Sequence, residues 1–401
     1  MKIAVVCDAH IFRTKNGEYW CSTVYSYNFF RRFLTVFDTV RVVARVKDCE
    51  FPADGKYLRV DGPGVEIHPV FFFQRPKQFL PNIGKVRRSL KGFEQGCDVI
   101  LYRMPSTTAQ VAYDMTRKAP QPKGIEVVYN LHDEMVDNTL SLPRKMIGWL
   151  NHKWVRRACR DRNVNGVSYV TKTILQGFYP SYARLHGPDE AHFENYYSTI
   201  QYQPDSIGTE KKYVGKRHWL ITHVVIHIQN KTRGHETLIR ALKRVRDQGY
   251  DMEIEFIGEG PLVQEFQTLA ASLGVADYVH FIGLLPSAAD VNEHLRNSDL
   301  FVYPTHFGGL PRVLIEAMGA GLPCISTPIA GIPEMLNEAD LISADDDAAL
   351  AKRLVEFAND PQYLEEQSKR SIRVAAEYTN DKLQKRRDEF YGRLKKLAEK
   401  E

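Results

Sequence analysis

The segment HFGGLPRVLIEAMGAGLPCISTP (306–328) contains residues whose types and spacing favour ligand binding. Gly308 and Gly309 lack Cβ atoms, so a ligand can approach the backbone closely there. Pro311 suits the first position of a predicted helix, whose free N–H groups favour phosphate. Glu316 follows more than one turn later, where a carboxylate can accept hydrogen bonds from a diol such as a ribose. The segment predicts a nucleotide site; the alternative is a plain strand-to-helix turn with a solvated Glu316.

The elements expected around this segment alternate between strands and helices. Short apolar, β-branched runs are typical of buried parallel strands, and apolar residues at helical spacing lie between them. In the second half of the chain we predict a helix at 234–249 and strands at 219–228, 251–261, 278–286, 299–306 and 323–328. In the first half we predict a helix at 16–34 and strands at 2–8, 39–46, 98–105, 125–133 and 166–171. This alternation predicts an α/β protein with parallel sheets.

The length of 401 residues exceeds that of a typical single core, so we expect two domains. A polar stretch, QPDSIGTEKKYVGKRH (203–218), separates the two series of strands. We therefore predict one domain at 1–203, a second at 204–377, and a C-terminal helix at 378–401 that either packs across the first domain or lies in solvent. Ligands of such sheets bind beyond the carboxyl ends of the strands, which here means the cleft between the domains.

The composition is that of an ordinary globular protein, with 43% hydrophobic and 26% charged residues. Asp8 interrupts the first apolar run, which argues against a signal peptide, and no stretch approaches the roughly 18 apolar residues of a membrane span. The six cysteines are scattered without a CxxC pair, which favours reduced thiols over a zinc site. We therefore expect a cytoplasmic protein.

Charge is unevenly distributed along the chain. Residues 1–203 carry 29 Lys and Arg against 19 Asp and Glu, whereas residues 204–401 carry 25 against 30. In the basic half, PVFFFQRPKQFLPNIGKVRRSLKGF (69–93) interleaves Phe with cations, and NHKWVRRACRDR (151–162) adds a basic run. Such segments can place a protein peripherally on the anionic inner face of the plasma membrane. The alternative is that Phe71 to Phe73 are core residues and the cations are solvated. We expect no nucleic-acid partner, because no reading module is recognisable.

Several motifs, in their order and spacing, resemble those of the retaining GT-B glycosyltransferases of family GT4. EAMGAGLPCISTPIAGIPEML (316–336) is similar to the family's EAMAxGxPVIAxxxGGxPE, FIGEGPL (256–262) to xVGxGP, VHFIGLL (279–285) to VxFxGxx, NSDLFVYPTH (297–306) to xADxFVxPS, and YNLHDE (129–134) to the strand-plus-HD element. The resemblance covers the second half well and the first half loosely. It implies the GT-B fold, in which two Rossmann-like domains face each other across a cleft.

The resemblance also implies roles for individual residues. Glu316 matches the second Glu of a family pair and would hold the donor ribose. His132 would contact the donor sugar, and Gly17 in the loop TKNGEYWCS (14–22) would border donor and acceptor. The remaining donor-binding positions would be Gly258, Leu284, His306, Gly308, Gly309, Leu310 and Pro311. The first Glu of the pair would fall at Gly308, so we expect His306 or Thr305 to replace its contact with the sugar.

Cleavage of a sugar–nucleotide bond leaves negative charge on the departing diphosphate, which fixed cations and backbone dipoles must stabilise in the absence of a metal. The family usually places an Arg and a Lys five residues apart before a Gly. Here Arg233 stands at the Lys position and Ile228 at the Arg position. We therefore expect Arg233 to be catalytic with Lys231 in support. No DxD pair follows a strand, and DDD (345–347) is expected to be a solvated loop or helix start, so we predict neither metal nor cofactor.

The sequence therefore predicts a retaining, metal-independent glycosyltransferase. It would move a sugar from a nucleotide-diphosphate sugar to a glycan or lipid-diphosphate-linked acceptor in cell-surface polysaccharide biosynthesis, with an anionic membrane surface as a further partner. The alternative is a catalytically silent nucleotide-sugar-binding protein, which Gly308 and Ile228 favour. A nicotinamide-dependent oxidoreductase is disfavoured, because no GxGxxG follows the first strand.

Overall fold

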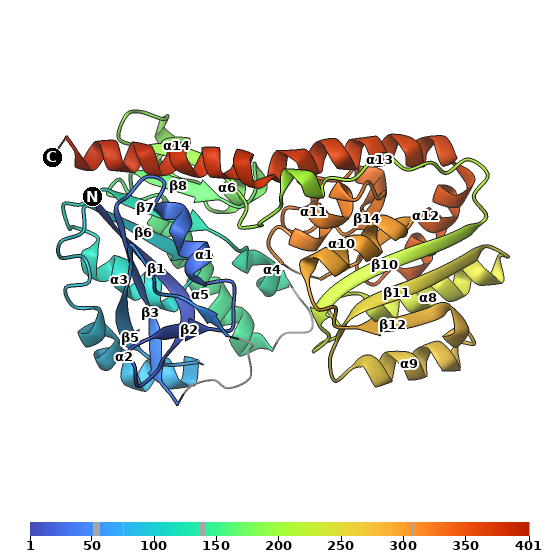
Figure 1. The fold of residues 1–401 in the computed structure, drawn as a ribbon, viewed down its shortest axis with the longest axis horizontal. Coiled ribbons are helices and arrows are strands. Elements are labelled where there is room, and N and C mark those ends of the chain that lie inside the picture. Colours follow the sequence, from blue (N-terminus) through green and yellow to red (C-terminus); the bar gives the residue numbers. More distant parts are fainter. Residues whose placement is uncertain (51–56, 75, 137–140, 307, 401) are drawn as a thin grey trace. The chain divides into compact units, whose positions relative to one another are not determined.

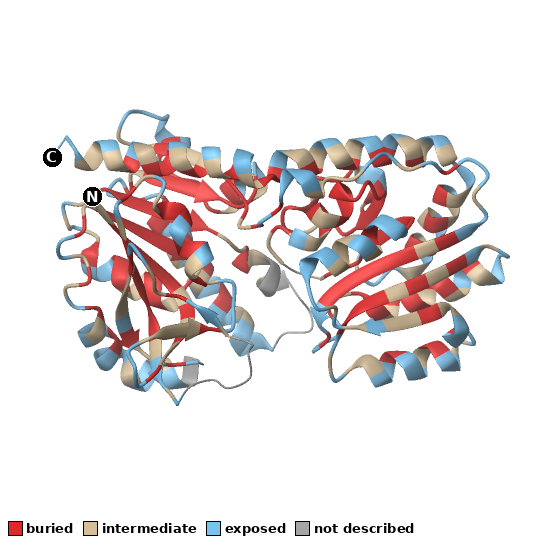
Figure 2. Cartoon of the chain, in the orientation of Figure 1, coloured by how far each residue is buried: buried red, intermediate tan, exposed pale blue. Residues whose placement is uncertain are grey.

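A computed structural model describes residues 1–50, 57–74, 76–136, 141–306 and 308–400. Within these residues the chain divides into two compact units. The first unit comprises residues of 1–135, 141–197 and 384–401, and the second comprises 198–383. Both units have helices packed on a largely parallel sheet, and most of the residues on the strands are buried (Figures 1 and 2). The α/β prediction with two Rossmann-like sheets is confirmed.

The first unit contains, in the described residues, a nine-stranded sheet. Its parallel strands follow the order β5-β3-β1-β6-β7-β8-β9, and the short β2 and β4 add antiparallel pairing beside β1. The strands are β1 Lys2–Arg13, β2 Tyr19–Cys21, β3 Thr39–Asp48, β4 Leu58–Arg59, β5 Val65–Phe71, β6 Val99–Met104, β7 Lys123–Val127, β8 Gly166–Tyr169 and β9 Phe193–Tyr196. Strand order diverges on either side of β1, which is the arrangement that binds ligands at the carboxyl edge of a sheet.

The helices of the first unit are α1 Tyr27–Phe30, α2 Pro76–Leu90, α3 Thr107–Thr116, α4 Leu131–Val136, α5 Leu142–Cys159, α6 Ile174–Phe178 and α7 Tyr182–His186. The predicted helix at 16–34 is wrong, because Trp20 pairs with Phe12 of β1 and only a short helix follows. The predicted strand at 125–133 ends at Val127. The backbone N–H of His132 instead donates to the Asn130 side chain at 3.1 Å, and α4 begins there.

The second unit contains, among its described residues, a five-stranded parallel sheet in the order β12-β11-β10-β13-β14. The strands are β10 His218–His227, β11 Asp251–Glu259, β12 Val279–Gly283, β13 Leu300–Tyr303 and β14 Cys324–Ser326. The helices are α8 His235–Asp247, α9 Val263–Ser272, α10 Ala288–Asn297, α11 Arg312–Gly319, α12 Asp347–Asn359 and α13 Pro361–Ala375. All five strands were predicted at their correct places, with ends that differ by up to three residues.

The C-terminal helix α14, Asn380–Ala398, contributes its residues from 384 onward to the first unit. Its Tyr391 ring lies 4.8 Å from the ring of Phe33, and Gln384 Nε2 donates to the Arg32 carbonyl oxygen at 3.0 Å. Tyr391 Oη also donates to the buried carboxylate of Glu126 at 2.7 Å. A buried carboxylate needs such donors, so this contact ties the end of the chain to the centre of the first sheet.

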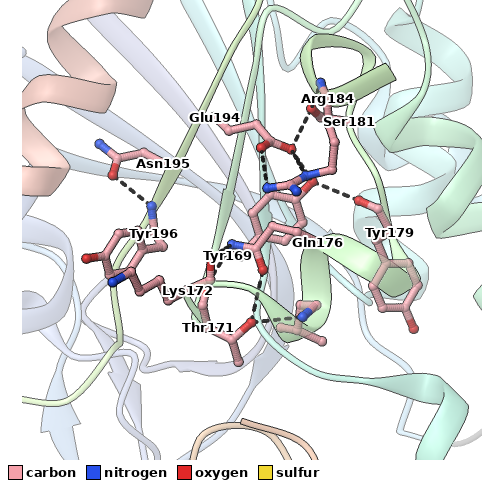
Figure 3. Close-up of polar contacts among 11 residues, drawn as sticks. Tyr169, Thr171, Lys172, Gln176, Tyr179, Ser181, Arg184, Glu194, Asn195 and Tyr196 are labelled. Carbon is pink, nitrogen blue, oxygen red and sulfur yellow. Dashed lines mark hydrogen bonds and ion pairs between the residues drawn. The ribbon is translucent and has the colours of Figure 1, made fainter. Parts of the chain in front are cut away.

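A second network joins the edge of the first sheet to its helices (Figure 3). Glu194 of β9 accepts from Arg184 of α7 at 2.9 Å, and Tyr169 Oη of β8 donates to the carbonyl oxygen of Tyr179 at 2.7 Å. The hydroxyl of Tyr179 then accepts from the backbone N–H of Leu131 at 2.9 Å. These bonds hold Leu131, the first residue of α4, against the sheet. His132 is the next residue of this helix.

Candidate functional site

Two loops meet at the carboxyl edge of the second unit's sheet. One follows β10 and the other follows β13, and these two strands are paired. The backbone N–H of His306 donates to the carbonyl oxygen of Thr232 at 3.0 Å. Gly234 has φ 81°, and a Cβ there would lie 2.3 Å from the Pro304 carbonyl oxygen. Only glycine permits this approach, so the loop that carries Arg233 is held directly on the loop that carries His306.

Arg233 is half-buried at this junction. Its Nη1 lies 3.2 Å from Thr305 Oγ1 and 3.4 Å from Tyr303 Oη. Thr305 is itself fixed, because its carbonyl oxygen accepts from Thr327 Oγ1 at 2.8 Å. These two neutral hydroxyl groups at the end of β13 help to orient the guanidinium. A guanidinium held in this way suits a phosphate or diphosphate.

Two other residues of the loop after β10, Lys231 and Ile228, have surroundings that differ from those of Arg233. Lys231 is exposed and forms an ion pair with Glu265 of α9. Since both side chains are about half exposed, water screens the pair and a ligand can compete for the ammonium group. Ile228 is fully buried, and its backbone N–H donates to the Glu259 carbonyl oxygen at 2.8 Å. The position where the resembled family carries an Arg is therefore a packing position in this chain.

The ring of His306 contacts the carboxylate of Asp345, which lies just before helix α12. Its Nε2 lies 3.0 Å from Asp345 Oδ1, and the His306 side chain is 19% exposed. Asp346 caps α12 through the Ala349 N–H at 2.8 Å, so the expected helix start is confirmed. Asp345 is 80% exposed, as expected for a solvated loop, and its carboxylate also contacts the ring of His306. The sequence shows three successive Asp residues but not that the first of them reaches another loop.

The glycine turn leads into α11 much as predicted, with one correction. Pro311 is the N-cap with ψ 114°, so the helix begins at Arg312 and not at Pro311. Leu310 is 9% exposed and anchors the turn, whereas Gly308 and Gly309 are half-exposed. A Cβ at Gly308 would meet nothing within 4 Å. The space beside Gly308 is open, and the phosphate site at this turn stays a prediction.

Glu316 lies on the fifth position of α11 and is half-buried. Burial raises the pKa of its carboxyl, and the charge of Arg312 opposes this increase. Tyr202 lies beside it: burial, followed by the charge of Glu316, raises the pKa of Tyr202 to about 12. Within the described residues no donor forms a hydrogen bond with the Glu316 carboxylate. Its lone pairs are therefore available to the hydroxyl groups of a ligand.

Gly258 and Leu284 occupy the ends of the next strands in the sheet. Gly258 has φ 137°, and a Cβ there would lie 1.7 Å from the Val225 carbonyl oxygen, so close packing of β10 and β11 requires this glycine. Leu284 follows β12 and is 48% exposed. Both remain predicted donor-binding positions, and the structure assigns a packing role to Gly258 in addition.

Gly17 and His132 belong to the first unit, whereas the other predicted site residues belong to the second. Gly17 has φ 78° in the turn after β1, and its N–H donates to the Thr14 carbonyl oxygen at 3.0 Å. His132 is half-buried at the start of α4, with its ring 4.7 Å from the ring of Phe178. His132 therefore sits in the first turn of a helix and not at a strand end.

A second group of polar residues, in the first unit, was not predicted from the sequence. Asp8 and His10 of β1 and Arg45 of β3 line a cavity of about 660 Å³. Burial, together with the nearby charge of Arg45, lowers the pKa of His10. The sequence feature that could have revealed this group lies in the run CDAHIF, at the carboxyl end of an otherwise apolar strand. Asp8 and His10 place polar side chains two positions apart there. Of the residues described, no three from His, Cys, Asp and Glu form a group that could hold a metal ion.

Comparisons with known proteins show what this chain is similar to in sequence and in fold. Residues 220–374 match the family model of glycosyl transferases group 1. The chain is similar to protein CapJ of Staphylococcus aureus, with 25% identity over 99% of this chain and 96% of CapJ. It is also similar to the putative colanic acid biosynthesis glycosyltransferase WcaL of Escherichia coli, with 34% identity over 31% of this chain and 33% of WcaL.

Two solved structures share the fold over nearly the whole chain. Sucrose-phosphate synthase from Thermosynechococcus elongatus has a TM-score of 0.69 and 13% identity, covering 99% of this chain and 100% of that one. Anabaena HepE, solved in complex with UDP, has a TM-score of 0.64 and 14% identity, covering 97% and 99%. The chain has the GT-B fold, with a Rossmann-like sheet in each unit. The segment that matches the model of glycosyl transferases group 1 lies within the second unit.

Proposed function

We propose that this protein transfers a sugar from a nucleotide-diphosphate sugar to a glycan or lipid-linked acceptor, with retention of anomeric configuration and without a metal, as a GT4-type enzyme. The observation that carries the proposal is the junction of the loops after β10 and β13. At this junction the guanidinium of Arg233 contacts Thr305, three residues before Gly308, and the turn leads into α11, whose fifth residue is Glu316. This order of a cation, backbone amides and a carboxylate along two adjoining loops supports a donor site there.

These groups match the parts of the donor. The diphosphate is bound by Arg233 and the amides of the turn, with Lys231 joining after it leaves Glu265. The ribose hydroxyl groups donate to Glu316, and the uridine-binding neighbour HepE supports a nucleoside diphosphate as the leaving group. His306, oriented by Asp345, lies next to the turn and provides the sugar contact that no side chain at Gly308 can make.

In the reaction, the bond between the anomeric carbon and the diphosphate oxygen breaks, and a bond from that carbon to the acceptor oxygen forms on the same face. The acceptor hydroxyl proton passes to the departing diphosphate, so the products are the glycosylated acceptor and a nucleoside diphosphate. Negative charge grows on the leaving group during this step. Arg233 therefore contributes more to the transition state than to the bound substrate.

The similarity to CapJ over almost the whole chain, and to a putative colanic acid biosynthesis glycosyltransferase over part of it, supports a role in assembling a cell-surface polysaccharide. The acceptor is then a growing glycan or its lipid-linked precursor.

The test is a two-stage assay. Thermal unfolding is first followed with UDP, GDP, dTDP, CDP and ADP and their sugar conjugates, with EDTA present, because a ligand of the folded state raises the melting temperature. The conjugate that binds is then used to measure release of nucleoside diphosphate with glycan and lipid-linked acceptors, and NMR of the product gives the anomeric configuration. We expect one base to be preferred and turnover to continue in EDTA.

Inversion of configuration, or activity that requires a divalent ion, would contradict the corresponding part of the proposal. Binding without turnover under any condition would favour the silent binding protein, to which the buried Ile228 already points.

A further inference from the structure

Strands β10 and β13 separate just before the loops of the candidate donor site. Among the described residues their pairing ends at Thr222 and Phe301, so the next positions, His223 and Val302, are not paired through their backbones. The side chain of His223 bridges the gap, because its Nδ1 atom donates to the Val302 carbonyl oxygen at 2.7 Å. One imidazole therefore links the two strands at the point where the sheet opens.

The His223 imidazole is fully buried and uncharged. A carbonyl oxygen can only accept a hydrogen bond, so the proton of the ring is on Nδ1. Nε2 then carries a lone pair, and within the described residues it has no hydrogen-bond partner. Burial lowers the pKa of His223 to about 4, so the ring is neutral at pH 7. A buried nitrogen without a partner costs free energy, which indicates that this histidine does something an apolar side chain could not do.

Three aromatic rings pack around this imidazole. The ring of Tyr303 is stacked on it with 5.5 Å between centroids, and the rings of Phe256 and His235 meet it edge-on at 5.4 Å and 4.6 Å. His235 is the first residue of α8 and lies two positions after Arg233. The imidazole of His223 therefore contacts both the strand that ends at the candidate site and the helix that begins there.

Tyr303 connects this packing to Arg233. It is buried, and its hydroxyl oxygen lies 3.4 Å from Arg233 Nη1. Its carbonyl oxygen accepts from Ser326 Oγ at 2.6 Å, so β14 also fixes its backbone. His223 restrains Tyr303 in two ways, through the carbonyl group of the preceding Val302 and by stacking on the ring. The position of the Tyr303 hydroxyl group therefore depends on His223.

We propose that His223 is a positioning residue for the transfer reaction: acting through Val302 and Tyr303, it holds the guanidinium of Arg233 in the orientation that meets the departing diphosphate. The inference rests on the proposed function, since it concerns the action of Arg233 in that reaction. A cation oriented in advance stabilises developing charge without reorganisation, whereas a displacement of about 1 Å can cost up to about 100-fold in rate. Phenylalanine would pack similarly but could not donate to Val302, which accounts for a polar ring in this place.

The first test is steady-state kinetics of the full-length protein with the donor identified by the melting assay. His223→Phe keeps an aromatic ring and removes the donor to Val302, and Tyr303→Phe removes the hydroxyl group that contacts Arg233. We expect kcat to fall about tenfold in His223→Phe and about fivefold in Tyr303→Phe, with the donor KM changed less than about twofold. The double variant should lose less than about twofold beyond His223→Phe, because the two changes interrupt the same chain of contacts.

Two further variants separate positioning from packing. Tyr213→Phe is the matched control, since its hydroxyl group is also buried in the second unit and donates to the Asp299 carbonyl oxygen at 2.9 Å. It should lower the melting temperature about as much as Tyr303→Phe and leave kcat unchanged. His223→Asn offers an amide donor in place of Nδ1 but lacks the ring. It should therefore be less stable than His223→Phe and yet have the higher kcat, an order that a packing role alone would not produce.

The second test does not depend on turnover. Rotation of the Arg233 guanidinium about its Nε–Cζ bond is followed by NMR of protein that contains isotope-labelled arginine, and the signal is assigned by its loss in Arg233→Lys. Losing one hydrogen bond should make this rotation about threefold faster or more in His223→Phe and in Tyr303→Phe than in the parent protein. Tyr213→Phe should match the parent protein.

Parent-like kcat in both His223→Phe and Tyr303→Phe would overturn the inference, and so would unchanged rotation of Arg233 in both. Losses of kcat that follow the melting temperature, with equal losses of donor affinity, would make His223 a packing residue only. A parent protein that binds donor without turnover would refute the proposed function instead. The NMR measurement would then still decide whether His223 and Tyr303 restrain Arg233.

Discussion

The Nε2 atom of His306 lies 3.0 Å from Oδ1 of Asp345, which joins the loop after β13 to the residue that precedes the cap of α12. The two residues are 39 positions apart in the sequence. The carboxylate is 80% exposed while the imidazole is 19% exposed, so the contact restrains the ring at the edge of the site without burying a charge. The contact therefore favours one orientation of the His306 ring.

Asp345→Asn should lower turnover about two- to fivefold, because a solvent-screened contact of an exposed carboxylate contributes up to about 1 kcal/mol to holding the ring. Donor affinity should change by less than about twofold and the melting temperature should stay constant, since Asp345 carries no buried contact. The control is Asp247→Asn, which removes an exposed carboxylate from a pair within α8. Equal losses in kcat and in donor affinity would make Asp345 a binding residue and not a positioning residue.

Glu316→Ala should weaken binding of the nucleoside diphosphate by about 10- to 100-fold, the usual effect of losing hydrogen bonds to a charged group. The measurement is calorimetric titration with the preferred nucleotide and with its 2′-deoxyribose analogue. The parent protein should discriminate between the two and the variant should not. Unchanged affinity of Glu316→Ala would remove this residue from the ribose role.

The same residue predicts a pH dependence of stability. Burial raises the pKa of Glu316 in the folded state, so the proton is bound more tightly in the folded than in the unfolded chain. Glu316 therefore contributes most to the free energy of unfolding at pH values below its pKa in the unfolded chain. This contribution is lost as the pH rises through its higher pKa in the folded chain. Glu316→Gln should therefore melt above the parent protein at pH 7, and the difference should shrink toward pH 4.

Glu365→Gln is a control in which the expected change in melting temperature at pH 7 has the opposite sign. Its hydrogen bond with Lys212 and the N–H of Tyr213 lower the pKa of Glu365. Stability from this carboxylate is present above its unfolded pKa and is lost as pH falls through the lowered folded pKa, so Glu365→Gln should melt below the parent at pH 7. If both variants changed the melting temperature at pH 7 in the same direction, the inference that burial raises the pKa of Glu316 would be contradicted.

Arg233→Ala should reduce kcat by about 100- to 1,000-fold, the cost of removing one preorganised donor to developing charge, with a smaller effect on donor affinity. Arg233→Lys should recover part of this loss, since the charge is kept without the planar donors. Lys231→Ala, two residues earlier, should cost less than about fivefold because Lys231 is exposed and shared with Glu265. Comparable kinetic losses at 231 and 233 would show that the two cations act together.

Two glycines of the second unit should respond in opposite ways to a side chain. Gly258→Ala places a Cβ 1.7 Å from the Val225 carbonyl oxygen at φ 137°, so it should lower the free energy of unfolding by about 3 kcal/mol or more. Gly308→Glu adds a side chain where nothing lies within 4 Å, and should change stability by less than about 1 kcal/mol. Denaturant unfolding measures both, and a severe loss in Gly308→Glu would show that the turn requires glycine for packing.

Much of the second unit was predictable because its local signals agree. The runs around β10, β11 and β13 are apolar and β-branched, and each is followed by a turn and an amphipathic helix, so strand, loop and helix follow from side-chain type alone. The first unit was harder. The run 16–34 has helical spacing, yet Gly17 turns the chain and Trp20 pairs with β1, because pairing across strands overrides a local preference. Strand β5 was missed because its exposed Pro69 and half-buried His68 break the apolar pattern.

The sequence by itself determined the class of fold, the glycine turn before α11 and the candidates Arg233 and Glu316, because these depend on residue type and on spacing of a few positions. Only the tertiary structure decided which groups meet. Asp345 reaches His306, Glu265 holds Lys231, and Ile228 is buried beneath the loop. Contacts between distant segments depend on how strands are ordered in a sheet, and spacing along one chain does not encode that order.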